Sequence, residues 1–283
     1  MKTPVLEPAA RIAAPDFNLD LTLDSGQVFH WRKKGRGYVG MISERPFYVE
    51  QEGDTLLVPA GCEKLASHYF ALDHPLPDIY RTFPDDPIMA RALECCRGLR
   101  IIRQPAWECL ATFITSSLKQ VPHIRQISHA IREAFGPAAR LNGAVLYAYP
   151  TAESLSLATE EELRACRLGY RAKNLLATAR VVASGGIDLV ELETMDDASA
   201  LDRLCELPGV GPKIANCVLL FAFGRLRAFP IDVWIGRVLR ENYFKRKRNV
   251  TEKRMRLFSS SYFGEFGGYA QQYLFHHART AGK

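Results

Sequence analysis

The sequence lacks the patterns that mark secreted and membrane-bound proteins. Its 283 residues include no apolar run long enough to cross a bilayer and no charged-then-apolar stretch near the N-terminus. The seven cysteines are odd in number, contain no C-x-x-C pair and follow no disulfide-like spacing. We therefore expect an intracellular protein with reduced thiols and no membrane partner.

The sequence also lacks internal repeats, low-complexity tracts and a large excess of one charge. The net charge of +6 and the pI near 8.9 favour a polyanionic partner only weakly, because many enzymes without such a partner are as basic. With 47% hydrophobic and 24% charged residues the composition is ordinary for a globular protein. The length allows one large domain or two modest ones with a sizeable core.

The N-terminal third is predicted to form an antiparallel sheet. Apolar and polar residues alternate from Phe17 to Leu23, which predicts a half-buried strand. Strand-like runs punctuated by glycines follow at 28–31, 38–42, 46–50 and 55–59. Five short strands joined by tight turns predict a sheet with one solvated face. We expect residues 1–15 to form a loose arm and residues 16–100 to form this sheet domain with flanking helices.

The remainder, residues 101–283, is predicted to be a mainly helical domain, which makes the fold class α+β. Apolar stripes and end signals indicate helices there at 105–118, 123–135, 160–167, 172–183 and 268–280. The helices predicted at 63–72 and 87–97 are those that flank the sheet. The basic run Lys245–Arg248 fits either a solvated loop or a non-specific phosphate contact.

The stretch 204–223 is predicted to be a helical hairpin. A helix ends near Cys205, the turn Leu207–Gly211 follows, and a second helix opens at Pro212, where proline suits the first helical position. The glycines allow a sharp turn and a close approach to a ligand. Free amides at such a turn and helix N-terminus form an anion site, most often for phosphate.

Two polar residues accompany the hairpin. Lys213 lies in the first turn of a helix that is otherwise nearly all apolar, and a lysine amine held beside apolar side chains can act as a nucleophile. Asp232, two residues after Pro230, suits the N-cap of another apolar helix. The alternative is an ordinary helix–turn–helix with a surface lysine and a capping aspartate.

These motifs resemble the 8-oxoguanine DNA glycosylase/AP lyase family of the helix-hairpin-helix-GPD superfamily. The resemblance extends from about Phe17 to Ala278 and includes Ser25-Gly26-Gln27 with Phe29, Trp31 and Arg32. Without the later motifs, these last residues would read as a hairpin with two core aromatics. The resemblance implies a partner, double-stranded DNA containing 8-oxoguanine, a monomeric enzyme, and a location in the cytoplasm or nucleoid of a bacterium or in a eukaryotic nucleus.

The resemblance implies that the hairpin anchors the DNA backbone. Gly209, Val210, Gly211 and Trp234 match backbone-contacting positions. The carbonyls of Cys205, Leu207 and Val210 match those that hold a structural monovalent cation. No cofactor is required, and the iron–sulfur loop of the endonuclease III branch is absent, because no cysteine follows Cys217.

The resemblance also assigns residues to the flipped base and to the space it leaves. The damaged-base pocket matches Gly26, Cys217, Gln271 and Phe275; the last two are four apart and so share a helix face. Tyr170 matches the wedge residue and Arg171 a contact to the estranged base. The alternatives are an ordinary helix start at Tyr170 and a core phenylalanine beside a surface glutamine.

The catalytic assignment follows from the Lys213 and Asp232 matches. Lys213 would attack the sugar C1′ and form a Schiff base that permits β-elimination. Asp232 would stabilise the positive charge that develops on the sugar. Hydrolytic members of the superfamily keep the aspartate and lack the lysine, so this pair implies a combined glycosylase and lyase.

Three positions depart from the eukaryotic family pattern. Trp234 replaces a histidine, Leu118 an asparagine, and His123 an arginine. All three changes weaken contacts to DNA, and Leu118 and His123 adjoin the estranged base. Two other functions stay open: a glycosylase for another damaged base, such as an alkylated purine, and a non-catalytic module that uses the hairpin to bind DNA.

Overall fold

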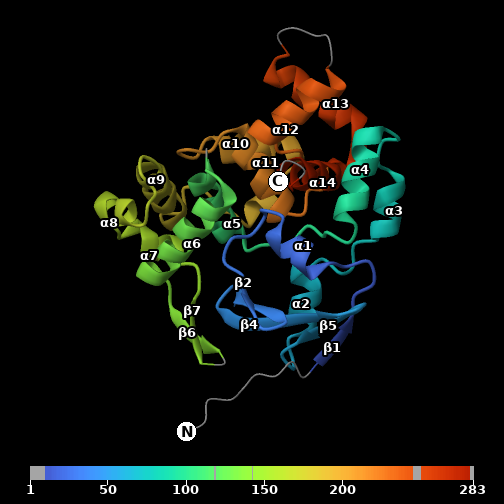
Figure 1. Ribbon diagram of the computed structural model, residues 1–283. Coiled ribbons are helices and arrows are strands. Elements are labelled where there is room, and N and C mark those ends of the chain that lie inside the picture. The colour runs from blue at the N-terminus through green and yellow to red at the C-terminus, as the bar shows by residue number, and fades with distance from the viewer. Residues whose placement is uncertain (1–9, 118, 142, 245–249, 281–283) are drawn as a thin grey trace.

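The computed structural model describes residues 10–117, 119–141, 143–244 and 250–280. Its N-terminal part contains a five-stranded antiparallel sheet in the order β1-β5-β4-β3-β2, seen at the bottom of Figure 1. The strands are β1 (Ala10–Ala13), β2 (Arg32–Lys34), β3 (Gly37–Ile42), β4 (Arg45–Glu52) and β5 (Thr55–Val58). β2 to β5 form a meander, and the predicted α+β class is confirmed.

Two of the predicted strands are wrong, and part of the predicted arm is ordered. The Phe17–Leu23 segment contains a helix, α1 (Leu19–Asp24), because the Asn18 side chain accepts a hydrogen bond from the Leu21 amide and caps it. Residues 28–31 are irregular, and the strand begins at Arg32. The fifth strand comes instead from Ala10–Ala13, which pairs with β5.

A first core fills the space between the sheet and α1 and α2 (Glu63–Tyr69). Trp31 packs near Phe47 and Phe70, and its indole N–H donates to the Tyr69 hydroxyl at 3.0 Å. The buried indole therefore keeps a hydrogen-bond partner while its ring fills the core. Gly40 has no room for a side chain, because a Cβ there would lie 2.5 Å from the Trp31 ring.

The second and larger core belongs to the helices. They are α3 (Leu76–Arg81), α4 (Pro87–Cys96), α5 (Ala106–Ser116), α6 (Val121–Phe135), α7 (Ala152–Ser156), α8 (Glu160–Ala165), α9 (Arg171–Ala183), α10 (Asp197–Cys205), α11 (Pro212–Phe221), α12 (Val233–Val238), α13 (Glu252–Tyr262) and α14 (Gly267–Thr280). The short helices η1 (Glu191–Glu193), η2 (Leu239–Tyr243) and η3 (Gly264–Phe266) lie in the same part of the chain. The hairpin β6 (Ala138–Leu141)–β7 (Ala144–Tyr147) instead packs against β3 and β4 in a small cluster of its own. Every predicted helix is present; α3, α7, α13 and the β6–β7 hairpin were not predicted.

The last helix, α14, packs against α4 and α12 (Figure 1). Its tyrosines reach back to the N-terminal half: the Tyr269 hydroxyl bonds His74 Nδ1 at 2.7 Å, and the Tyr273 hydroxyl donates to the Leu99 carbonyl at 2.9 Å. Through these bonds α14 is tied to the segment between His74 and Leu99. The proposed boundary near residue 100 stays a prediction.

Candidate active site

The predicted hairpin joins α10 to α11 through the turn Leu207–Gly211, with Pro212 at the first position of α11. Gly209 has φ +80°, and a Cβ there would lie 2.7 Å from Asn174, so the turn packs directly on α9. Thr178 of α9 donates to the Pro208 carbonyl at 2.9 Å. At Gly211 the backbone faces open space, and no described side chain caps α11. The first amides of α11 are therefore free to bind an anion.

Lys213 occupies the first turn of α11 and is half-buried. Its Nζ lies 5.2 Å from the centre of the Phe113 ring on α5. One turn later, burial raises the pKa of the Cys217 thiol to about 11, although the charge and hydrogen bonding of Lys213 oppose the shift. The amine is therefore held among an aromatic ring, a neutral thiol and the apolar helix surface.

Asp232 caps α12, as predicted. Its Oδ1 accepts a hydrogen bond from the Ile235 amide at 2.8 Å. Burial raises the pKa of this carboxyl, while the Ile235 hydrogen bond and the charge of Lys213 act in the opposite direction. Lys213 and Asp232 both line one cleft of about 1010 Å³.

The same cleft reaches the predicted base pocket. Gly26 and Phe275 line it, and a Cβ on Gly26 would lie 3.1 Å from the Phe275 ring and 3.3 Å from the Val121 side chain. With φ +86°, this position favours glycine on both steric and conformational grounds. Cys217 and Gln271 are buried behind the lining, and the Gln271 Oε1 has no hydrogen-bond partner among the described residues.

Of the predicted wedge and estranged-base residues, Tyr170, Arg171 and His123 lie outside the cleft lining. Tyr170 is 58% exposed immediately before α9, as an inserting side chain would need to be. Arg171 is only 5% exposed: its Nε donates to the Ser117 carbonyl at 2.8 Å, and its guanidinium lies 4.3 Å from the Tyr170 ring centre. His123 is exposed on α6, and Leu118 lies outside the described residues. Arg171 thus fixes the end of α5 in this structure.

Of the remaining predicted DNA contacts, Trp234, Gly209 and Gly211 line the cleft. Trp234 is 41% exposed, lines the cleft, and lies 5.6 Å from the Arg237 guanidinium. Val210 is buried, and its amide donates to the Leu207 carbonyl at 3.0 Å. The basic run Lys245–Arg248 lies outside the described residues.

The sequence reasoning missed several residues that line the cleft: Phe29, Phe113, Lys119, Gln120, Arg240 and Arg279. A signal existed for Arg279, because positions 271, 275 and 279 follow one another at helical spacing. No comparable signal exists for Phe29 or Phe113, which reach the cleft only through tertiary packing.

Two family models match the chain. Residues 10–110 match the family model described as "8-oxoguanine DNA glycosylase, N-terminal domain". Residues 113–262, more than half of the chain, match that of the "HhH-GPD superfamily base excision DNA repair protein". The chain belongs to the 8-oxoguanine DNA glycosylase family.

Relatives of this 8-oxoguanine glycosylase family member span its full length. A probable N-glycosylase/DNA lyase of Methanothermobacter thermautotrophicus is 31% identical, with 96% of each chain covered. The structure of MBOgg1 in complex with a low-affinity DNA ligand superposes with TM-score 0.92 at 33% identity, covering 100% of this chain and 98% of that one. The Clostridium acetobutylicum 8-oxoguanine glycosylase/lyase bound to DNA with cytosine opposite 8-oxoG gives TM-score 0.90 at 29% identity, with 97% and 99% covered.

Two further features concern the described residues as a whole. None of the helices there is both long and apolar enough to cross a membrane. The same residues contain no group of three or more histidine, cysteine or acidic side chains able to hold a metal ion.

Proposed function

We propose that this protein excises 8-oxoguanine from duplex DNA and then cleaves the strand at the abasic site. The observation that carries the proposal is that Lys213, Asp232, Gly26 and Phe275 line a single cleft beside the hairpin turn. Nucleophile, charge stabiliser and base pocket are thus within reach of one flipped nucleotide.

The hairpin would hold the DNA backbone through the free amides of α11 and the turn glycines Gly209 and Gly211. The carbonyls of Cys205, Leu207 and Val210 fit a monovalent cation: Leu207 already accepts from the Val210 amide, and a carbonyl oxygen has a second lone pair. A cation there would add positive charge beside a phosphate. Trp234 would contact the strand at the cleft edge, and Tyr170 would fill the space vacated by the flipped base.

In the reaction, the Lys213 Nζ attacks C1′ as a free amine, and the C1′–N9 bond breaks as the base leaves with its electron pair and gains a proton. Ring opening gives a Schiff base between Lys213 and C1′. Loss of a C2′ proton then expels the 3′ phosphate by β-elimination. The Asp232 carboxylate stabilises the positive charge on the sugar during base departure.

The pocket would recognise the base from two sides. Phe275 offers a ring for stacking, and the Gly26 carbonyl offers an acceptor for the extra N7 hydrogen of 8-oxoguanine. The Gln271 amide would read the Watson–Crick edge once the base enters, giving its buried Oε1 a donor.

We further propose that the enzyme acts as a monomer. It would act in the compartment that holds the chromosome, which is the cytoplasm or nucleoid of a bacterium or the nucleus of a eukaryote.

Two other functions are weaker. A hydrolytic glycosylase for alkylated purines would not need Lys213, and a non-catalytic binding module would need neither Lys213 nor the half-buried Asp232. A covalent Schiff base at Lys213 would distinguish the proposed function from both of these alternatives.

Borohydride trapping on a duplex with one 8-oxoguanine tests the proposal. The wild type should form a covalent adduct and Lys213→Gln should form none. Lys119→Gln, which neutralises another lysine of the cleft lining, should trap normally. Efficient trapping by Lys213→Gln would assign the nucleophile elsewhere. Adducts only on a preformed abasic site, or base release only from an alkylated duplex, would overturn the assignment to 8-oxoguanine.

A further inference from the structure

The turn after α1 lines the cleft through Gly26. The carbonyl of Asp24 accepts from Arg279, that of Ser25 from Gln272 Nε2 at 3.1 Å, and that of Gln27 from Gln104 Nε2 at 2.9 Å. Within the described part of the chain, no hydrogen bond engages the carbonyl of Gly26, which lies between them. Side chains from other elements therefore hold the turn on both sides of Gly26.

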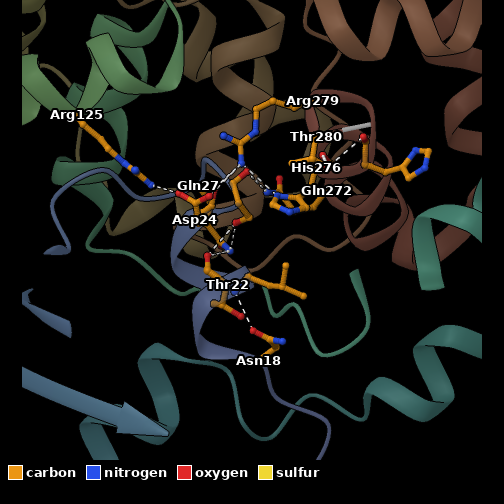
Figure 2. Close-up of polar contacts among 12 residues, drawn as sticks. Asn18, Thr22, Asp24, Gln27, Arg125, Gln272, His276, Arg279 and Thr280 are labelled. Carbon is orange, nitrogen blue, oxygen red and sulfur yellow. Dashed lines mark hydrogen bonds and ion pairs between the residues drawn. The ribbon is translucent and has the colours of Figure 1, made fainter. Parts of the chain in front are cut away.

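One carboxylate ties this turn to both helices that flank Gly26. Asp24, the last residue of α1, pairs with Arg125 of α6 and with Arg279 of α14, the latter at 4.0 Å (Figure 2). α6 contributes Val121 and α14 contributes Phe275, the two side chains nearest Gly26. We call Asp24, Arg125 and Arg279 the Asp24 latch.

Arg279 is the central member of the latch. It lies one helical turn after Phe275, with its guanidinium 6.0 Å from the ring centre, and it borders the cleft. Burial and the charge of Arg279 lower the pKa of His276 to about 4, so the neutral ring can accept a hydrogen bond from Arg279 at 3.2 Å. Arg279 thus joins the turn and α14 through one side chain.

The Asp24 latch contributes little to the stability of α1. A carboxylate at the last position of a helix gains nothing from the helix dipole. The Asp24 side chain is 55% exposed, and such ion pairs contribute little to global stability. What the three charges do is restrain the turn against α6 and α14.

We propose that the Asp24 latch positions the Gly26 carbonyl against Phe275 and so sets recognition of the flipped base. This inference rests on the proposed function and makes Asp24 a positioning residue. Loosening the turn should slow base excision, because a displacement of about 1 Å at a positioned group can cost about 10²-fold. Cleavage at a preformed abasic site should not change, because no base has to be recognised there.

The test compares Asp24→Asn with Asp20→Asn. Asp20 lies on the same short helix and pairs with Lys33 and Tyr38, so the control removes the same charge away from Gly26. Asp24→Asn should not weaken attraction to phosphate, because it removes a negative charge. We therefore expect DNA affinity to hold while single-turnover release of 8-oxoguanine falls at least about tenfold, within the loss that misplacement can cause.

Three measurements decide the result: base release, strand cleavage at a preformed abasic site, and melting temperature. Support requires slow base release with normal abasic cleavage in Asp24→Asn, normal behaviour of Asp20→Asn, and partial recovery in Asp24→Glu. Wild-type base release by Asp24→Asn, or a parallel fall of both activities, would overturn the inference alone. A wild-type enzyme that cleaves abasic sites but releases no 8-oxoguanine would overturn the proposed function and the inference with it.

Discussion

Asp232 performs two tasks that a single substitution can separate. It caps α12 through the hydrogen bond from the Ile235 amide, and its negative charge faces the site of Lys213. Asp232→Asn keeps an oxygen in the capping position, and Asn and Asp cap helices about equally well. Asp232→Ala removes both the cap and the charge, so the two variants differ mainly in the cap.

The expected magnitudes differ for folding and for catalysis. Loss of one aimed electrostatic stabiliser costs about 10²–10³-fold in rate, or about 2.7–4 kcal/mol, so both variants should excise 8-oxoguanine at least about 10²-fold more slowly. Only Asp232→Ala should lose the cap, at about 0.5–2 kcal/mol. Single-turnover excision and urea unfolding measure the two effects on the same samples.

The pH dependence gives an independent check. Because the folded state raises the pKa of Asp232 above 3.8, folding disfavours its ionised form. Its contribution to the free energy of unfolding therefore falls as pH rises from 3.8 through the raised value, and Asp232→Asn should remove this decline. Activity should need the ionised form, so the acid limb of the excision rate should lie above pH 3.8. An Asp232→Asn enzyme within about threefold of the wild-type rate would refute the electrostatic role, given the loss expected for such a group.

Three further predictions concern other parts of the molecule. Phe275→Ala should weaken binding of an 8-oxoguanine duplex by about 1–3 kcal/mol of lost stacking while leaving undamaged duplex unaffected; equal weakening of both, measured by fluorescence anisotropy, would make Phe275 a core residue only. Arg132→Met should cost about 3–5 kcal/mol in urea unfolding, because it leaves the buried Glu108 without its ion-pair partner, and adding Glu108→Leu should restore most of it. Cytosine should be the preferred base opposite 8-oxoguanine but with weak discrimination, since a bidentate contact is worth about 1–3 kcal/mol; His123→Arg with Leu118→Asn should sharpen the preference in excision assays opposite each base, and no change would exclude these positions from partner choice.

Much of the fold could be predicted because local patterns agree with the tertiary structure. The hairpin turn, the helix start at Pro212 and the Asp232 cap all depend on residues close together in sequence. The failure at Phe17–Leu23 arose because alternation and helical spacing overlap in so short a segment. Leu19, Thr22 and Leu23 are the buried residues of α1, a spacing that suits a helix, and the Asn18 cap decides between the two.

The sequence predicts the residues of the candidate site whose type carries the chemistry. It does not predict the side chains whose position depends on tertiary packing. Lys213 and Asp232 could be identified from their positions beside the hairpin and before a helix. The side chain of Arg171 could not be placed, because its partner, the Ser117 carbonyl, is 54 positions away. The contribution of Phe113 beside Lys213 likewise depends on how α5 packs against α11.

The contact between α14 and the turn after α1 has a consequence for biosynthesis. Ser25 and Gln272 are bonded across 247 positions, so the base pocket cannot form until α14 has left the ribosome. The hairpin and Lys213 emerge earlier, without the helix that selects the base. A chain that stops before α14 would carry the DNA anchor and the nucleophile but no means of choosing its substrate. Because α14 follows the hairpin in the sequence, a chain that stops between the two does not acquire a working base pocket.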